Sequence, residues 1–234
     1  MKALIFAAGL GERMRPLTDH TPKPLIEAGG KSLIVWHLEK LAAMGVQDVV
    51  INTSWLADRF PVVLGDGAPW GLRIQYLYEG DTPLETGGGM LNALALLGEA
   101  PFLLVNGDIW TDLDFNRLPR EPQGLAHLVM IDPPGYATHG DFALDPAGHV
   151  RGDGERRLTY AGIGVYRPAL LDGWAQHVDD HASIAGNGKP RFRLAPILRA
   201  HMPAGRIHGE HHAGRWTDVG TPERLADLNR ELSR

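Results

Sequence analysis

Short apolar runs alternate with helical patterns along the first half of the chain, and this alternation is the strongest constraint on its fold. The run at Lys2–Phe6 is followed by a helical pattern at 33–44, with Ser32 as its N-cap and Gly45 as its end. Further strands are predicted at 48–52, 74–78 and 102–106, and further helices at 57–64 and 87–97. Repeated strand and helix units predict an α/β fold, with a Rossmann-like, mostly parallel central sheet flanked by helices and ligands at the carboxyl ends of the strands.

The second half of the chain has a different pattern. Strands are predicted at 125–131, 141–145, 149–153 and 160–166, and a turn at 146–148 joins the middle two. Helical patterns return at 194–202 and 225–232, where Thr221 can cap the second helix and Pro222 can occupy its first turn. The polar, glycine-bearing segment 178–191 is predicted to be a mobile loop. We expect one domain, 1–234, in which the β-rich part forms a smaller lobe.

Composition limits what the chain can do. Its 234 residues, 44% of them hydrophobic, are enough for one substantial core. A net charge of −5 argues against a general nucleic-acid binder and against a basic membrane-surface protein. The absence of cysteine excludes disulfides, thiolate zinc sites and cysteine nucleophiles, and it is compatible with a reducing cytoplasm. The apolar start breaks at Gly9, and no run approaches the ~18 residues of a membrane span, so we expect a buried first strand and a cytoplasmic protein.

The first predicted strand leads into a glycine-rich loop. The loop carries Gly9, Gly11 and Arg13, and Lys23 follows between two prolines. Glycines allow a phosphate chain to approach the backbone closely, and the two cations can neutralise its charge. The loop is neither a Walker A loop, which requires Gly-Lys-Ser/Thr, nor a dinucleotide fingerprint, because Met14 stands at the position of the third glycine. A pair of glycines alone favours an ordinary connection between elements.

Two aspartates are candidates for metal binding. Asp108 follows a predicted strand directly, and Asp218 follows a late turn. Magnesium takes carboxylate oxygens alongside substrate phosphates, so the two side chains could converge on one ion. Considered singly, an aspartate in a turn is more often a cap or a hydrogen-bond acceptor.

Taken together, these motifs resemble those of the sugar-1-phosphate nucleotidyltransferase family. Residues 7–18 and 22–25 match every fixed element of the family pattern A-A-G-x-G-x-R-x-x-P-x-T followed by P-K-P-L. The other motifs follow in family order, with E-T-G-G-G at 85–89, V-N-G-D at 105–108 and W-T-D-V-G-T at 216–221. The resemblance spans nearly the whole chain. It implies a mainly nucleotide-binding lobe, 1–124, and a mainly sugar-binding lobe, 125–234, that also supplies the second metal ligand.

The resemblance implies a role for each matching residue. Arg13, Lys23 and Asp108 are expected to be catalytic, with Lys23 neutralising the α-phosphate, and Asp108 and Asp218 are expected to bind Mg²⁺. The nucleotide is expected to contact Ala8, Gly9, Gly11, Arg13, Lys23, Thr86, Gly87 and Gly88. The sugar phosphate is expected to contact Asn106, Gly140, Asp141, Gly162 and Arg193. Flexible entry into a helix would also account for the glycines at 87 and 88.

Some positions depart from the family pattern or leave a role open. Larger hexose-1-phosphate enzymes of the family carry Glu-Lys-Pro after the hairpin, whereas this chain has D-G-E-R-R at 153–157, which includes Glu155. Arg193 stands where relatives tend to carry lysine, which keeps the charge but changes the geometry. Glu79 and Glu85 lie near the predicted nucleotide site and could orient either the base or the loop.

Within the family, the resemblance is greatest to short bacterial uridylyltransferases. It implies a Mg²⁺-dependent enzyme that converts UTP and N-acetylmuramate α-1-phosphate to UDP-N-acetylmuramate and pyrophosphate in peptidoglycan recycling. The alternative enzymes are a mannose-1-phosphate guanylyltransferase and a glucose-1-phosphate uridylyl- or thymidylyltransferase. A non-catalytic nucleotide-sugar sensor is a further alternative, which the intact Lys23, Asp108 and Asp218 disfavour. No nucleic-acid or membrane partner is expected.

Three other groups of residues are predicted to be structural. The D-L-D run at 112–114 is similar to a glycosyltransferase metal motif but is predicted to form a surface turn and a helix cap. His208, His211 and His212 are predicted to be ordinary histidines of an exposed strand or hairpin, because the chain has neither the cysteines nor the H-E-x-x-H helix of a zinc site. Four tryptophans are predicted to lie in the core or in a pocket wall: Trp36, Trp55, Trp70 and Trp110.

Overall fold

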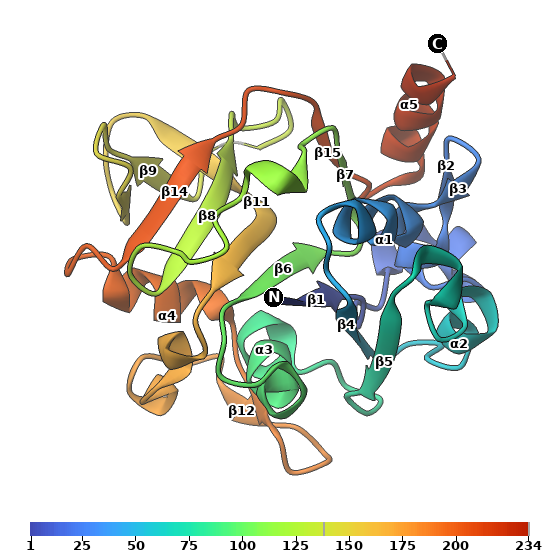
Figure 1. Ribbon diagram of the computed structural model, residues 1–234, viewed down its shortest axis with the longest axis horizontal. Helices are drawn as coiled ribbons and strands as arrows, with labels where there is room; N and C mark the ends of the chain where they lie inside the picture. Colours follow the sequence, from blue (N-terminus) through green and yellow to red (C-terminus); the bar gives the residue numbers. More distant parts are fainter. Residues whose placement is uncertain (138, 234) are drawn as a thin grey trace.

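The computed structural model describes residues 1–137 and 139–233. Its main element there is a nine-stranded sheet whose central path runs β10-β9-β11-β6-β1-β4-β5, with β8 paired to β11 and β14 paired to β8 (Figure 1). The strands from β6 to β5 are parallel to one another. The predicted α/β fold with a parallel sheet in the first half of the chain is therefore confirmed.

The bounds of the elements are close to the predicted ones. The α-helices of the described residues are α1 (Leu33–Ala43), α2 (Arg59–Leu64), α3 (Glu85–Leu97), α4 (Leu194–His201) and α5 (Pro222–Leu232). The strands of the main sheet are β1 (Lys2–Phe6), β4 (Asp48–Thr53), β5 (Arg73–Tyr78), β6 (Phe102–Asn106), β8 (Ala126–Ile131), β9 (Phe142–Leu144), β10 (Val150–Arg151), β11 (Arg157–Tyr166) and β14 (Ile207–His211). Three short pairs complete the set: β2 (Glu27–Ala28) with β3 (Lys31–Ser32), β7 (Ile109–Thr111) with β15 (Trp216–Asp218), and β12 (Ser183–Ile184) with β13 (Pro190–Arg191).

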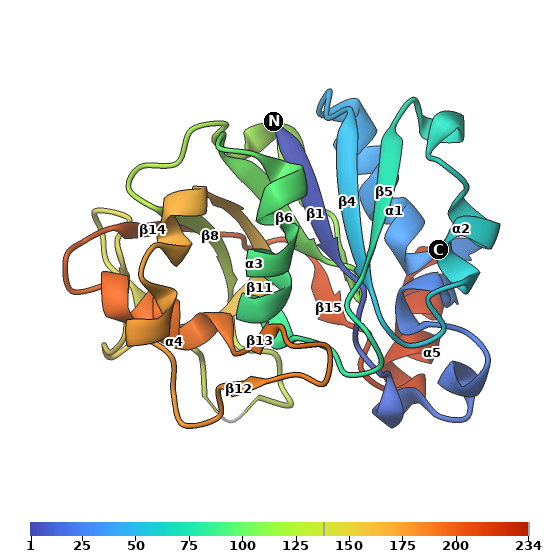
Figure 2. The same cartoon turned by 90° about the horizontal axis from the view of Figure 1, so that it is seen from below.

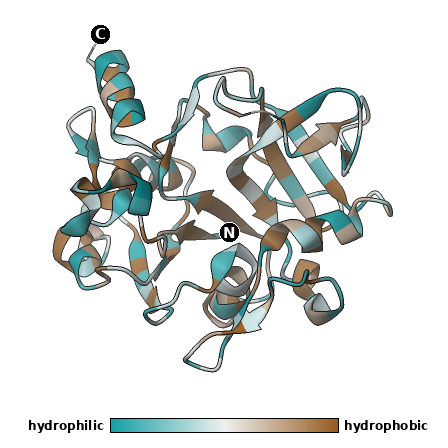
Figure 3. Ribbon diagram, turned by 180° about the vertical axis from the view of Figure 1, so that it is seen from behind, coloured by the Kyte–Doolittle hydropathy of each residue, from teal (hydrophilic) through white to brown (hydrophobic). Residues whose placement is uncertain are grey.

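Helices cover both faces of the parallel strands. Figure 2 shows α1 and α3 on opposite sides of β1 and β4. Along β1, Ala3 and Ile5 belong to the core on the α1 face, whereas Leu4 belongs to the core on the α3 face. Because the strand is buried on both sides, its sequence is a continuous apolar run without polar alternation. Figure 3 shows the same distribution, with hydrophobic residues concentrated on the central strands.

The predicted β-rich second half joins the same sheet. β11 runs antiparallel between β6 and β8, so it connects the parallel strands to the rest of the sheet. The β9–β10 hairpin forms one end of the path, and its strands are shorter than the predicted ones. β14, which carries His208 and His211, lies parallel to β8, so this segment is a strand as predicted; His211 is exposed, but His208 is half-buried.

The C-terminal helix α5 packs against the N-terminal half of the chain. Leu228 of α5 belongs to a small core that also contains Met14, from the glycine-rich loop, and Trp110, from β7. Thr221 caps α5 by accepting a hydrogen bond from the backbone N–H of Arg224, and Pro222 follows as the first helical residue, both as predicted. This packing holds β15 beside β7, a pairing that the sequence did not indicate.

The other residues with predicted structural roles lie as expected. Asp114 caps a short helical turn by accepting the N–H of Asn116, and Asp112 accepts the N–H of Arg215 in a neighbouring turn. Trp110 is buried, and Trp36 and Trp70 pack against the cores. Among residues 1–137 and 139–233, no helix has both the length and the apolar character needed to cross a bilayer.

His37 makes the stability of this fold depend on pH. Its ring is fully buried, and its Nε2–H donates to the carbonyl oxygen of Ile109 at 2.9 Å. Within the described residues, Nδ1 is buried without a hydrogen-bond partner, so a proton added there would carry its charge into the core. Burial lowers the pKa of His37 from 6.5 to about 4.

We expect the folded state to lose stability as the pH falls from 6.5 towards 4, because the unfolded chain takes up the proton that the folded chain rejects. The loss attributable to His37 at pH 5 is about 2 kcal/mol. Replacing His37 with glutamine retains an N–H donor without a titrating group. Urea unfolding of both proteins at pH 7.5 and pH 5 tests this expectation, and an equal loss of stability in both would contradict it.

Candidate active site

A cleft of about 660 Å³ opens at the carboxyl ends of β1, β4, β5 and β6. Ligands of open α/β sheets bind at this edge, because the loops that leave the strands diverge there. The cleft is lined by two stretches of the chain and several single residues: 6–14, 81–83, Lys23, Pro24, Asn52, Glu79, Glu85, Thr86, Asn106, Asp108, Arg191 and Gly220. Of the residues expected to act in catalysis or to bind the nucleotide, all but Gly87 and Gly88 are among them.

The glycine-rich loop is held in its shape by Thr18 and Trp55. Gly11 adopts a left-handed conformation with a φ of 66°, and a Cβ there would lie 2.8 Å from Cγ2 of Thr18. The Thr18 hydroxyl donates to the carbonyl oxygen of Gly11 at 2.7 Å, and Nε1 of Trp55 donates to the carbonyl oxygen of Thr18 at 2.9 Å. The conformation and the close approach both require glycine at position 11. Trp55 thus supports the pocket wall, one of the two roles predicted for it.

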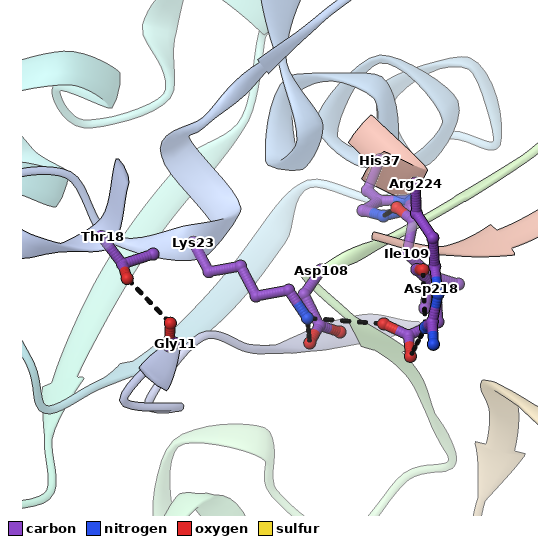
Figure 4. A network of polar contacts seen from close by, with 8 residues as sticks. All are labelled: Gly11, Thr18, Lys23, His37, Asp108, Ile109, Asp218 and Arg224. Atoms are coloured by element: carbon purple, nitrogen blue, oxygen red, sulfur yellow. Dashed lines mark hydrogen bonds and ion pairs between the residues drawn. The ribbon is translucent and has the colours of Figure 1, made fainter. Parts of the chain in front are cut away.

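One lysine joins two carboxylates from distant parts of the sequence (Figure 4). Nζ of Lys23 lies 2.6 Å from Oδ2 of Asp108 and 3.4 Å from Oδ1 of Asp218. Asp108 lies between β6 and β7, whereas Asp218 ends β15, which pairs with β7 so that Asp218 is opposite Ile109. Lys23 is only 7% exposed. A nearly buried ammonium between two carboxylates gives each charge a partner and fixes the spacing of the two acids.

Arg224 binds the second carboxylate, that of Asp218, through the oxygen that does not face Lys23. Its Nη1 lies 2.9 Å from Oδ2 of Asp218, so this carboxylate has one cation on each side. The guanidinium carbon of Arg224 lies 3.5 Å from the centre of the Tyr136 ring, a cation–π contact with the loop between β8 and β9. Arg224 was not among the residues predicted from the sequence. The sequence signal that could have found it is its position three residues after the N-cap Thr221. Side chains in the first turn of a helix point towards its N-terminus, and so towards the residues that precede the cap.

The two carboxylates fit a divalent cation such as magnesium. Both present hard oxygen donors, and they share a single positive group, the ammonium of Lys23. Asp108 lines the cleft, whereas Asp218 is not among the lining residues. In the part of the chain that the structure describes, no cluster of three or more ligating side chains could hold a metal alone. Magnesium is commonly held by one or two carboxylates together with substrate phosphates, and this pair matches that pattern.

A buried polar network ties the floor of the cleft together. The side-chain oxygen of Asn52 accepts the backbone N–H of Ala7 at 2.7 Å, and its Nδ2 donates to Oε1 of Glu79 at 2.8 Å. The other carboxylate oxygen of Glu79 accepts the N–H of Leu84 at 2.9 Å. Glu79 is 1% exposed, and this burial raises its pKa. Glu79 therefore links β5 to the start of the glycine-rich loop and to the segment that leads into α3.

The glycines that begin α3 serve close packing. The N–H groups of Gly87 and Gly88 both donate to the carbonyl oxygen of Phe192, at 2.9 and 3.1 Å. A Cβ on Gly87 would lie 2.5 Å from the Phe192 ring. The hydroxyl of Thr86 accepts the N–H of Leu194 at 2.9 Å. Of these three predicted nucleotide contacts, the structure places Thr86 on the cleft and the two glycines behind it.

The residues expected to bind the sugar phosphate are more dispersed. Asn106 lines the cleft, and Gly162, in a left-handed conformation with a φ of 74°, makes room for it: a Cβ there would lie 2.5 Å from Nδ2 of Asn106. Asp141 accepts the N–H of Tyr160 at 2.9 Å, and the carbonyl oxygen of Gly140 accepts Nε of Arg157. Arg193 is exposed at the N-cap of α4, and Glu155 is exposed in the turn before β11. Of the five predicted residues, only Asn106 is in the set of residues that line the cleft, and Gly140, Asp141, Gly162 and Arg193 lie outside it.

Comparison with known proteins places this geometry in a family. Residues 2–141 match the nucleotidyl transferase family. The chain belongs to this family. The N-acetylmuramate alpha-1-phosphate uridylyltransferase of Neisseria meningitidis serogroup B is 45% identical to it, covering 97% of this chain and 96% of the relative. The enzyme of the same name from Caulobacter vibrioides is 34% identical, covering 94% of this chain and 92% of the relative.

The fold comparison agrees. A crystal structure of a Bacillus anthracis protein in complex with a sucrose superposes with a TM-score of 0.83 at 19% identity, covering 99% of this chain and 95% of that one. At this identity the similarity shows the fold alone. The nucleotidyl transferase fold predicted from the sequence motifs is thus confirmed.

The polar network under the cleft predicts the effect of one substitution. A Cβ on Gly89 of α3 would lie 2.8 Å from Oε1 of Glu79 and 2.9 Å from Nδ2 of Asn52. We expect Gly89→Ala to destabilise the protein by about 1–3 kcal/mol, although alanine favours helices, because neither buried partner can move without losing a hydrogen bond. Gly186→Ala is the control, since an added Cβ there meets no atom within 4 Å. Urea unfolding measures both changes, and equal stability of the two variants would contradict the expectation.

Proposed function

We propose that the protein transfers a uridylyl group from UTP to N-acetylmuramate α-1-phosphate, forming UDP-N-acetylmuramate and pyrophosphate in peptidoglycan recycling. The observation that carries this proposal is the convergence of Lys23, Asp108 and Asp218 beside the glycine-rich loop. The choice of base and sugar is supported by the Neisseria and Caulobacter relatives, which align with nearly the whole chain. The use of a nucleoside triphosphate as donor is consistent with a cytoplasmic location of the protein.

The proposed nucleotide site lies in residues 1–124. Ala8, Gly9 and Gly11 let the triphosphate approach the backbone of the loop, while Arg13 and Lys23 balance its negative charge. Thr86 belongs to the same cleft lining. Gly87 and Gly88 support this wall by letting α3 pack against Phe192.

The chemistry follows from the charges in the site. The phosphate of the sugar-1-phosphate is ionised at neutral pH, so one of its oxygens can attack the α-phosphorus of UTP without a general base. The new P–O bond forms as the bond from the α-phosphorus to the bridging oxygen breaks, and pyrophosphate leaves with that oxygen. Lys23 carries a fixed positive charge where negative charge builds up at the α-phosphate, and no covalent enzyme intermediate is needed.

The carboxylates complete the charge balance. Asp108 and Asp218 would hold a magnesium ion, which supplies charge compensation for the phosphate oxygens of both substrates. Lys23 and Arg224 keep the two acids in place and oriented. Because Asp108 comes from the first half of the chain and Asp218 from the second, the metal site would join the proposed nucleotide and sugar parts.

The proposed sugar site lies mainly in residues 125–234. Asn106, seated against Gly162, lies at the end of the cleft next to Asp108. Gly140 and Asp141 lie on the segment before β9, and Arg193 carries an exposed positive charge at the start of α4. We propose that these residues receive the sugar-1-phosphate.

Pyrophosphate release by the purified protein tests the proposal. The reaction contains Mg²⁺ and crosses UTP, dTTP, GTP and CTP with the α-1-phosphates of N-acetylmuramate, N-acetylglucosamine, glucose and mannose. We expect release with UTP and the muramate phosphate to exceed every other combination. A preference for GTP with mannose phosphate, or for a glucose phosphate, would overturn the substrate assignment and keep the chemistry. Binding of nucleotide sugars without any release would favour the sensor.

Substitutions at the charged centre test the metal assignment. We expect Asp108→Asn and Asp218→Asn to raise the Mg²⁺ concentration for half-maximal activity by about tenfold or more, because each removes one charged ligand. Lys23→Ala is the comparison: it should lower the maximal rate by about 100-fold or more even at saturating Mg²⁺, since added magnesium does not replace the charge that acts on the phosphate. If both aspartate variants reach half-maximal activity at the same Mg²⁺ concentration as the parent protein, the metal assignment is wrong.

A further inference from the structure

Glu85, in the lining of the cleft, has an unusual backbone conformation. Its φ is 63°, in the left-handed region that favours glycine, and Leu56 is the other non-glycine residue with a positive φ in the described ranges. Glu85 is the first residue of α3 and lines the cleft, as do Pro83 and Thr86 on either side of it. A side chain in this conformation is strained, and such strain persists only where surrounding contacts impose it.

Arg191 supplies those contacts from a segment more than 100 residues away. Its Nη2 donates to Oε1 of Glu85 at 2.6 Å, and its Nε donates to the carbonyl oxygen of Pro83 at 3.1 Å. One guanidinium thus holds both the strained residue and the backbone two residues before it. Exposed ion pairs contribute little, but here the Arg191 and Glu85 side chains are only 33% and 36% exposed, and the planar guanidinium is fixed by its second bond.

The hairpin that carries Arg191 is itself attached to the cleft wall. Asn187 donates to the carbonyl oxygen of Glu79, and the N–H of Phe192 donates to the carbonyl oxygen of Leu84 at 3.2 Å. With Arg191, these bonds tie segment 187–192 to residues 79–85. A mobile loop was predicted at 178–191, whereas in the structure the end of this segment makes specific contacts with residues 79–85.

We infer that the Arg191–Glu85 ion pair is a clasp that holds the wall formed by 83–86 in the conformation that accepts the nucleotide. This inference rests on the proposed function, because it assigns this wall to the nucleotide. Arg191 is then a positioning residue, which acts through the backbone of Glu85. Without the clasp, Glu85 relaxes from the left-handed conformation, and Pro83 and Thr86 move with it.

A direct role for Arg191 is the competing explanation, since Arg191 also lines the cleft and could bind a phosphate itself. Glycine at position 85 separates the two roles. Glycine adopts a positive φ without strain, so it can keep the shape of the wall when the clasp is absent. It cannot replace a lost contact between the arginine and a phosphate.

The experiment measures the dissociation constant of Mg²⁺-UTP by calorimetry, together with the KM values for both substrates. The proteins are the parent, Arg191→Ala, Glu85→Ala, Glu85→Gly and the double variant Arg191→Ala with Glu85→Gly. Arg73→Ala is the control, because Arg73 also forms an arginine–carboxylate pair, with Asp48, and neither residue lines the cleft. Thermal unfolding of each protein checks that it is folded.

We expect Arg191→Ala and Glu85→Ala each to weaken UTP binding about five- to tenfold, because both leave a strained residue without its clasp. Glu85→Gly should bind UTP more tightly than Glu85→Ala, and adding it to Arg191→Ala should recover most of the lost affinity. The KM for the sugar-1-phosphate should change less than the KM for UTP. Arg73→Ala should bind as the parent does.

Two results would overturn the clasp. If Arg191→Ala binds UTP as tightly as the parent, the ion pair does not shape the site. If Arg191→Ala binds weakly and glycine at position 85 restores nothing, Arg191 touches the nucleotide directly. Failure of the parent protein to bind UTP would instead contradict the proposed function, so the two failures are distinguishable.

Discussion

Two carboxylates held at close range repel each other unless a cation lies between them, and the rest of the structure is arranged to satisfy this requirement. Lys23 supplies the cation between Asp108 and Asp218, and Arg224 adds a second one behind Asp218. The contact is possible because β15 pairs with β7 and α5 packs on the N-terminal half of the chain. The small core around Leu228 therefore stabilises the geometry of the charged centre as well as the fold.

The sequence predicted the parallel part of the fold well because each of its strands is buried on both faces. Such strands are continuous apolar runs, and the helices between them show their own period. The pairing of the short strands could not be predicted from such patterns. β7 and β15 have three residues each, and their pairing depends on residues more than 100 positions apart. A sequence pattern of local period carries no information about such a contact.

The sequence motifs predicted the charged residues that the structure brings together, but not the residues that act through another residue. Lys23, Asp108 and Asp218 were predicted because they occupy matching positions of the family's motifs, and the structure brings them together. Arg224 has the sequence character of an ordinary helix surface, and Asn52 is only the polar end of an apolar strand. Their functions depend on what faces them across the fold, which a single sequence does not show.

The order in which the charged residues occur along the chain has a consequence for protein synthesis. Lys23 and Asp108 leave the ribosome first, and at that stage the lysine has one carboxylate partner. Asp218 and α5 follow much later, and α5 must dock before the second carboxylate reaches its place. A nascent or truncated chain that stops before residue 218 therefore lacks half of the charged centre. The charged centre is therefore among the last parts of the structure to form during synthesis, however well the first strands have folded.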